Sequence, residues 1–242
     1  MPVQRPALRL FIPASAPAVT SQQNDFTQEI SENSISVLID KIKNMRRVDF
    51  REAHGAPNYA DMQQSVFARL FQGYIVSNHK DKNVFIHAFR QGPLCEGPFC
   101  GDKFHISVRR EQVPQAFQIL SGLLFSEDSP IDKWKVTDID RVRPESRVSI
   151  GAQFTLYIKA DQKTSFYSAD FLHSIKELVG NIESRLEMHN ISAGEHPCSD
   201  VMSGGWKYVS YRNEFRSDRE GSEMQSHRLR EEPFYRIMTE ET

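Results

Sequence analysis

Basic side chains and one histidine alternate with apolar residues in two strand-like segments. Lys103 and His105 lie two positions apart in the first segment, and Lys133 and Lys135 lie two positions apart in the second. Because successive side chains of a strand point to opposite faces, the members of each pair share a face. If the two faces meet, they suit an anion. Phosphate is the natural candidate, because it attracts the point charges of lysines.

Further basic residues lie at the ends of neighbouring segments. Arg147 is expected to open the next strand, and Tyr157 and Lys159 share a face near its far end. Arg212 ends the last predicted strand, and Arg219 follows it in a loop. If all these faces converge, several cations surround the histidine, which is costly unless an anion completes the site. The alternative is that each charged face is solvated separately, as charged strand faces usually are.

Two common kinds of phosphatase site are missing from the sequence. A tyrosine-phosphatase loop needs an arginine six positions after its cysteine, and none follows Cys95, Cys100 or Cys198 at that distance. Two-metal hydrolysis needs converging carboxylates and histidines, and the aspartates near the strands show no such signature. We therefore expect neither a metal nor a cofactor. The three cysteines make no disulfide framework, which favours folding in a reducing compartment, and we interpret them as loop thiols.

The composition narrows the function classes further. The 242 residues include 30 basic and 32 acidic side chains, for a formal net charge of -2, which argues against a general nucleic-acid binder. No apolar run approaches the roughly 18 residues of a membrane span. The first residues also lack the apolar stretch of a Sec signal peptide. If the protein leaves its cell, we expect another route.

Four apolar stripes have the helical period, and five segments have strand character. The stripes are Ile35, Leu38, Ile39 and Ile42; Met62, Val66, Phe67, Leu70 and Phe71; Val113, Ala116, Phe117, Leu120 and Leu124; and Ile175, Leu178, Val179, Ile182 and Leu186. The predicted strands are 83–89, 103–108, 133–139, 147–159 and 206–212. Helices and strands do not alternate strictly, so the sequence predicts an α+β fold. We expect a single globular domain of mixed helices and twisted sheet over residues 34–242, and a monomer.

Residues 1–33 are rich in Pro, Ala, Ser, Gln, Asn and Thr, and they predict a flexible arm ahead of the domain. Within the arm, Arg5 is followed by Leu8, Leu10 and Ile12. These residues form either a small apolar patch that folds back on the body or a short docking peptide whose aliphatic side chains fill a groove on a partner. The residues alone favour the patch.

Five long segments resemble signature blocks of the OspF/SpvC family of phosphothreonine lyases, which bacterial type III secretion systems inject into host cells. The segments are GDKFHISV (101–108), SEDSPIDKWKVTD (126–138), RVSIGAQFTLYIK (147–159), WKYVSYRNEFRSDREGSEMQ (206–225) and LREEPFYR (229–236). The resemblance runs in register from about residue 46 to the C-terminus. It implies a metal-free enzyme that acts on the pThr-x-pTyr activation loop of host MAP kinases. The phosphate is lost by β-elimination, which leaves dehydrobutyrine and suppresses immune signalling in the host cytoplasm and nucleus.

The resemblance also assigns roles to individual residues. Lys135 resembles the general base, His105 the general acid, and Asp200 a supporting carboxylate. The remaining positions match substrate-binding residues: Lys103, Lys133, Arg147, Arg212 and Tyr157 for the phosphothreonine, Lys159 and Arg219 for the phosphotyrosine, and Arg90 in the same cluster. The first 45 residues depart from the family pattern. Arg5, Leu8, Leu10 and Ile12 fit the family's kinase-docking peptide loosely, since only one basic residue precedes the aliphatic ones, but the resemblance favours docking over the apolar patch. The polar stretch that follows them suits a type III secretion signal.

The charge pattern is consistent with this chemistry. Neighbouring cations and desolvation both lower the pKa of a lysine, so the cluster around Lys135 would bind phosphate and keep part of the base neutral. A bound phosphate dianion would hold the proton of His105. Two other functions fit the same cations: a catalytically silent phosphopeptide-binding module and a conventional phosphatase.

Overall fold

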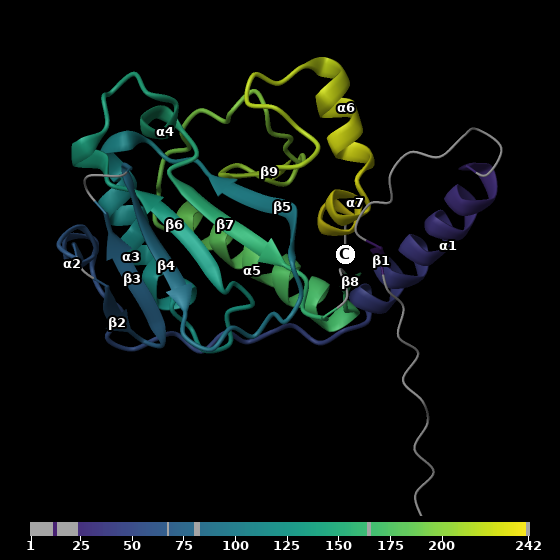
Figure 1. The fold of residues 1–242 in the computed structure, drawn as a ribbon, viewed down its shortest axis with the longest axis horizontal. Coiled ribbons are helices and arrows are strands. Elements are labelled where there is room, and N and C mark those ends of the chain that lie inside the picture. The colour runs from purple at the N-terminus through teal and green to yellow at the C-terminus, as the bar shows by residue number, and fades with distance from the viewer. Residues whose placement is uncertain (1–11, 14–23, 67, 80–82, 164–165, 241–242) are drawn as a thin grey trace, which may run out of the picture.

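The computed structural model describes residues 12–13, 24–66, 68–79, 83–163 and 166–240, and its centre is a seven-stranded sheet (Figure 1). All neighbouring strands are antiparallel, in the order β2-β3-β4-β6-β7-β5-β9. The strands are β2 (Arg69–Phe71), β3 (Tyr74–Asn78), β4 (Phe85–Arg90), β5 (Phe99–Ile106), β6 (Lys133–Thr137), β7 (Phe154–Lys159) and β9 (Val209–Asn213). With the helices below, this sheet confirms the predicted α+β class.

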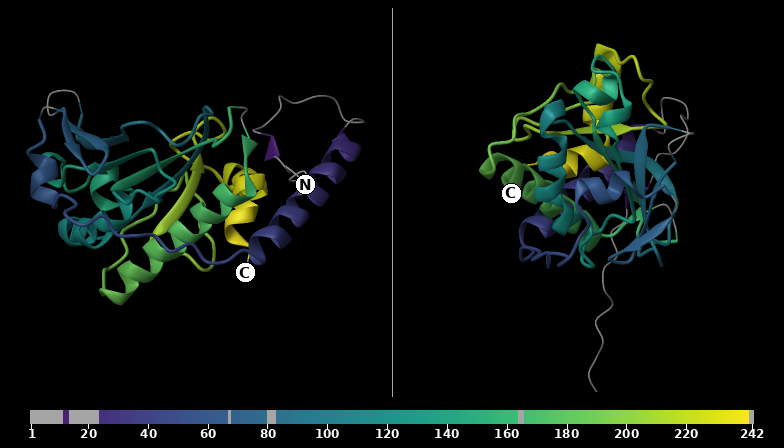
Figure 2. Two further views of the ribbon diagram at one scale, coloured as in Figure 1. Left: turned by 90° about the horizontal axis from the view of Figure 1, so that it is seen from below. Right: turned by 90° about the vertical axis from the view of Figure 1, so that its left-hand side faces the viewer.

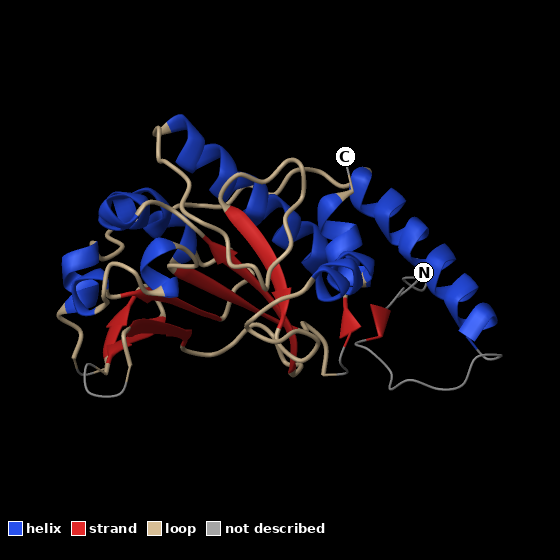
Figure 3. Cartoon of the chain, turned by 90° about the horizontal axis from the view of Figure 1, so that it is seen from above, coloured by secondary structure: helices blue, strands red, loops and turns tan. Residues whose placement is uncertain are grey.

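Two long helices cover one face of the sheet. Helices α3 (Val113–Leu124) and α5 (Ala169–Met188) lie behind the strands in Figure 1, and the view from above in Figure 3 also shows helices gathered on one side of the sheet. Both helices follow predicted stripes whose members are buried. Ser168 caps α5 by accepting a hydrogen bond from the backbone of Phe171, which satisfies an amide that the helix itself leaves free. The opposite face of the sheet carries the predicted basic residues of β5 and β6.

The remaining helices lie at the ends and edges of the sheet. They are α1 (Asn24–Lys43), α2 (Tyr59–Gln63), α4 (Arg147–Ile150), α6 (Glu223–Glu231) and α7 (Pro233–Thr239), with single 3₁₀ turns at Arg110–Gln112 and Ile139–Arg141. Helix α1 packs against α5 and α7, and the left view of Figure 2 shows it beside α7. In the part of the chain that is described, no helix is long and apolar enough to cross a membrane.

Strand β6 shows why the sheet has one dry and one polar face. Trp134 is fully buried and packs edge-on against Phe125, with ring centroids 5.1 Å apart. Val136 is fully buried on the same side. Lys133 and Lys135 alternate with them and therefore lie on the other face, as predicted. By the same alternation, Lys103 and His105 of β5 lie on the polar face of the sheet, and Phe104 lies on the buried face.

The second predicted helix was wrong at its C-terminal end. Helix α2 stops at Gln63, and residues 69–71 form strand β2, which pairs with β3. The two strands are joined by Gln72 and Gly73, whose φ angles of 45° and 76° make a tight hairpin. Such a turn matches the twist of the paired strands. It therefore favours a β-hairpin here, although the apolar residues recur with the period of a helix. Phe67 lies outside the described residues.

The predicted strand 147–159 was also wrong in its first half. Arg147 begins the one-turn helix α4, and the strand starts only at Phe154. The chain changes direction at Gly151, where a Cβ atom would lie 1.7 Å from the carbonyl oxygen of Glu195. Ala152 follows with a φ of 51°. This close approach of two distant segments interrupts a run that is apolar enough for a continuous strand.

Only parts of the predicted arm can be compared with the structure. Helix α1 begins at Asn24, inside the segment predicted as arm, and Arg5, Leu8 and Leu10 lie outside the described residues. The backbone of Ile12–Pro13 forms β1, which pairs with β8 (Phe166–Tyr167) on the body. This backbone pairing places the end of the segment beside the body, and the side chains of the predicted patch lie outside what the structure describes.

Candidate active site

A cavity of about 280 Å³ opens on the polar face of the sheet, and most of the predicted site residues line it. The predicted residues in its wall are Lys103, His105, Lys135, Arg147, Tyr157, Arg212 and Arg219. They come from four strands, helix α4 and the loop after β9. Basic side chains from separate strand faces thus converge on one cavity, as predicted.

The strand register fixes how these side chains face one another. Lys103 lies directly opposite Tyr157 on one side and Arg212 on the other. In the next cross-strand row on the same face, Thr155 lies between Lys135 and His105. Residues that lie opposite each other in antiparallel strands have Cβ atoms about 5 Å apart and share a face. The lysine and the histidine therefore face one cavity from strands two positions apart in the sheet.

His105 is held by a buried carboxylate. Its Nδ1 lies 2.6 Å from Oδ2 of Asp200, which also accepts a hydrogen bond from Ser210 at 2.8 Å. The Ser199 hydroxyl donates to the other oxygen at 2.9 Å. Since Asp200 occupies Nδ1, Nε2 is the nitrogen that remains for the cavity. Burial lowers the pKa of His105, and the Asp200 carboxylate opposes that shift.

Lys135 has the environment of a lysine that loses its proton easily. Burial and then the charge of Lys103 lower the pKa of Lys135 to about 8, with smaller contributions from Lys133 and Arg219. Its Nζ lies 3.7 Å from the centre of the Phe85 ring. Among the described residues, no carboxylate lies within ion-pair distance of Lys135. A substantial fraction of this lysine is therefore neutral near pH 8.

His87 lies directly opposite Lys135 on the neighbouring strand β4. Burial, followed by the charges of Lys135 and Lys133, lowers the pKa of His87 to about 4. The imidazole is therefore neutral at pH 7 and adds no charge beside the lysine. His87 was not identified as a site residue from the sequence, although its strand, 83–89, was predicted.

The cations that face the cavity are only partly neutralised. Lys103 pairs with Glu214 at 3.1 Å, and Glu214 also lines the cavity. Arg147 donates to Ser199 at 3.1 Å and lies 3.9 Å from Asp200. Its buried Nε has no hydrogen-bond partner within the described residues. A buried guanidinium nitrogen without a partner is costly, and an anion in the cavity would supply the missing acceptor. Glu214 was not identified from the sequence.

Three predicted site residues lie outside the wall of the cavity. Lys133 is its neighbour, with Nζ 4.6 Å from the centre of the Tyr157 ring. Lys159 donates to the carbonyl oxygen of Cys95 at 3.0 Å.

Arg90 is the clearest departure from the predicted cluster. Its side chain is buried and pairs with Asp132 at 3.1 Å. The guanidinium also donates to the hydroxyl of Tyr74 at 2.7 Å and to the carbonyl oxygen of Ser129 at 2.6 Å. The hydrogen-bond donors of Arg90 are thus occupied by Tyr74 and the 126–132 loop, so we assign Arg90 a structural role.

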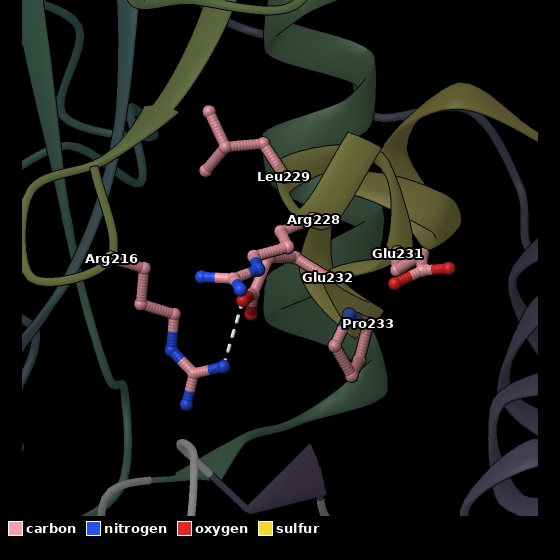
Figure 4. A pocket seen from close by; sticks show the side chains of 6 residues that line it. All are labelled: Arg216, Arg228, Leu229, Glu231, Glu232 and Pro233. Atoms are coloured by element: carbon pink, nitrogen blue, oxygen red, sulfur yellow. Dashed lines mark hydrogen bonds and ion pairs between the residues drawn. The ribbon is translucent and has the colours of Figure 1, made fainter. Parts of the chain in front are cut away.

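A second cavity differs in its charges (Figure 4). Its wall consists of Arg216, Arg228, Leu229, Glu231, Glu232 and Pro233. Arg216 pairs with Glu232 at 2.7 Å, so the positive and negative charges there compensate each other. Among the described residues, no group of three or more histidine, cysteine, aspartate and glutamate side chains is placed to hold a metal ion.

Known proteins of similar sequence and structure share this architecture. The chain matches the OspF/SpvC family over residues 2–240, so the match includes nearly all of the segment in which the sequence motifs were weakest. It is 53% identical to phosphothreonine lyase OspF of Shigella flexneri over 242 residues, covering 99% of this chain and 100% of the relative. It is 52% identical, with the same coverage, to the MAPK phosphothreonine lyase of Salmonella typhimurium.

Two solved structures resemble the fold closely. The Salmonella plasmid virulence C protein (SpvC) superposes with a TM-score of 0.84 at 54% identity, covering 88% of this chain and 99% of that one. The phosphothreonine lyase effector VirA (SpvC) of Chromobacterium violaceum gives a TM-score of 0.84 at 55% identity, covering 89% and 100%. The match over residues 2–240 and these relatives show that the chain belongs to the OspF/SpvC family.

Proposed function

We propose that this protein is a phosphothreonine lyase, a carbon–oxygen lyase that removes phosphate from the phosphothreonine of a host MAP kinase by β-elimination. The observation that carries the proposal is the position of Lys135. It faces His105 across a cavity of cations and has a pKa lowered to about 8. Relatives that are named phosphothreonine lyases support the same chemistry.

The elimination uses the two residues on opposite sides of the bound phosphothreonine. The lone pair on Nζ of Lys135 takes the Cα proton, and the electrons of the Cα–H bond form the Cα=Cβ double bond. The Cβ–O bond breaks, and its electron pair leaves with the phosphate. Nε2 of His105 gives its proton to the departing oxygen. The products are dehydrobutyrine and inorganic phosphate, and no water is consumed.

The surrounding cations bind the substrate and stabilise the charge of the leaving phosphate. Lys103, Arg147 and Arg212 contact the phosphothreonine phosphate, with Tyr157 and Lys133 beside it. Arg219 and Lys159 receive the phosphotyrosine. In the absence of substrate, Glu214 partners Lys103. A phosphate dianion carries more charge than this carboxylate and replaces it as the partner of the lysine.

The cellular context follows the family. We propose that type III secretion delivers the protein into a host cell, where it acts in the cytoplasm and nucleus as a monomer and suppresses immune signalling. Arg5, Leu8, Leu10 and Ile12 serve as the kinase-docking peptide. Because β1 pairs with β8 in the free protein, docking would require this pairing to break so that the segment around Ile12 can bind the kinase.

Mass spectrometry of a pThr-x-pTyr peptide after incubation with the protein separates the three candidate functions. A lyase gives a product lighter by one water than the peptide that carries only the phosphotyrosine. A phosphatase that acts on the phosphothreonine gives that phosphotyrosine peptide itself, and a binding module leaves the substrate unchanged. Either of the last two results would overturn the proposal.

A further inference from the structure

The cavity continues into a row of exposed apolar side chains on the same face of the sheet. Leu70 of β2 lies directly opposite Ile75 of β3, and Ile75 lies opposite Phe89 of β4. Phe89 in turn lies opposite Lys133, the neighbour of the cavity. Because directly opposite residues share a face, this apolar row and the phosphate-binding cations form one continuous band across the sheet.

The apolar row is unusual for a sheet face that meets water. The exposed fractions are 60% for Leu70, 38% for Ile75 and 39% for Phe89. Tyr74 and Val76, the neighbours of Ile75 along β3, are fully buried on the other face of the sheet. The exposure of Ile75 therefore does not result from a shift in strand register. Large apolar side chains that adjoin one another on the surface mark sites where another molecule binds.

Lys133 connects the row to the cavity. Its Nζ lies 5.4 Å from the centre of the Phe89 ring and 4.6 Å from the centre of the Tyr157 ring. The lysine is thus held between the last member of the apolar row and a wall residue of the cavity. A chain that leaves the cavity along the band meets Lys133 and then Phe89.

We infer that the row of Leu70, Ile75 and Phe89 binds apolar side chains of the substrate protein itself, about four or five residues from the phosphothreonine. The inference rests on the proposed function. Strands are spaced about 4.8 Å apart, which places Ile75 and Leu70 roughly 12–16 Å from Lys135, the length of four or five extended residues. The surface would therefore select phosphothreonine segments that are flanked by aliphatic or aromatic residues.

The experiment compares synthetic peptides that differ only at these flanking positions. Each peptide contains pThr-Gly-pTyr with an otherwise serine- and glycine-rich sequence. One carries leucines four and five residues before the phosphothreonine, a second carries them four and five residues after it, and a third carries serines at all these positions. For the wild-type protein, one leucine peptide should show a kcat/KM about tenfold above that of the serine peptide, mainly through KM. The preferred end defines the direction of the bound chain.

The matched variants are Leu70→Thr with Ile75→Thr and, as control, Met188→Ser. Threonine keeps the strand propensity of β2 and β3. Met188 is 68% exposed and ends α5, a helix that lies behind the sheet in Figure 1. The double variant should lose the leucine preference, whereas the control keeps it. Turnover of the serine peptide shows that each variant is folded.

The outcomes separate this inference from the proposed function. If the wild-type protein releases no phosphate by elimination from any peptide, the lyase proposal fails. If it turns over all three peptides equally, or if the double variant keeps the full leucine preference, the binding row is wrong. Sedimentation of the wild-type protein provides the remaining check. If the wild-type protein is a dimer and the double variant Leu70→Thr with Ile75→Thr is a monomer, the row binds a second copy of the chain and the inference is overturned.

Discussion

Thr155 lies directly between Lys135 and His105 in one cross-strand row of the sheet. The lysine and the histidine are therefore separated by two strand spacings, about 10 Å between backbones, and both side chains reach into the same cavity. In the proposed reaction, the phosphothreonine lies between them, with its Cα proton toward the lysine and its phosphate toward the histidine. The rigid ladder, rather than a loop, sets this separation.

Replacing Lys135 with alanine should abolish elimination while substrate still binds. The variant loses the group proposed to take the Cα proton but keeps the cations proposed to hold the phosphate, so we expect kcat to fall by roughly 10²–10⁴-fold or more. Release of inorganic phosphate measures kcat, and calorimetric titration with a doubly phosphorylated peptide measures the Kd. Near-normal turnover by this variant would remove Lys135 from the role of base.

Replacing Lys103 with glutamine should shift the pH dependence of the reaction. After burial, the charge of Lys103 is the largest influence that lowers the pKa of Lys135. Its removal raises that pKa above about 8, and it leaves Glu214, whose charge acts in the same upward direction. Because the base must be neutral, activity is lost as pH falls through the pKa of Lys135. The acidic limb of the kcat/KM profile should therefore move to higher pH.

The pH profile distinguishes this effect from a loss of phosphate binding. Weaker binding alone lowers kcat/KM at every pH and leaves the midpoint of the acidic limb in place. An unchanged midpoint, or one at lower pH, would mean that Lys103 does not tune the base. Arg219→Gln is a comparison in the same cavity, and its smaller influence on Lys135 predicts a smaller shift in the same direction.

Asp200 to asparagine should impair the acid rather than the base. The amide keeps the shape of the side chain but removes the charge that opposes the effect of burial on the pKa of His105. That pKa falls further, so the protonated imidazole exists only at lower pH. We expect kcat to drop by about 10²-fold, and the basic limb of its pH profile to move to lower pH. A fall in rate without movement of that limb would indicate a merely structural carboxylate.

The sequence predicted those parts of the site that a strand determines by its own period. Lys103 and His105 alternate with the fully buried Phe104, and Lys133 and Lys135 alternate with the fully buried Trp134. Successive side chains of a strand point to opposite faces, so a buried face and a charged face on opposite sides of a strand can be predicted from the sequence alone. The convergence of these faces needed the strand order, which the pattern does not contain.

Features that depend on contacts between distant segments were missed. Arg147 belongs to a helical turn because Gly151 approaches Glu195, and no local signal marks that approach. Helix α6 buries only Gln225 and Leu229, which is too little for an apolar stripe. The alignment of Asp200 with His105 spans 95 positions of the sequence, and only the family resemblance suggested it.

Replacing Arg90 with leucine should destabilise the protein and leave its chemistry intact. Asp132, the partner of Arg90, is also buried, and it accepts hydrogen bonds from the backbone of Leu94 and Cys95. Removing the arginine leaves this carboxylate without its counter-charge, which typically costs about 3–5 kcal/mol. Urea denaturation measures the change in the free energy of unfolding, and kcat is measured on the folded variant below the transition.

Arg51 offers a matched control for this prediction. It also pairs with an aspartate, at 2.8 Å from Asp128, but its side chain is 74% exposed. Solvent screens such a pair, so Arg51→Leu should change the stability little. If Arg90→Leu were as stable as Arg51→Leu but lost turnover, Arg90 would belong to the substrate site after all. Because its guanidinium already donates to Asp132, Tyr74 and Ser129, we expect the opposite: loss of stability at constant kcat.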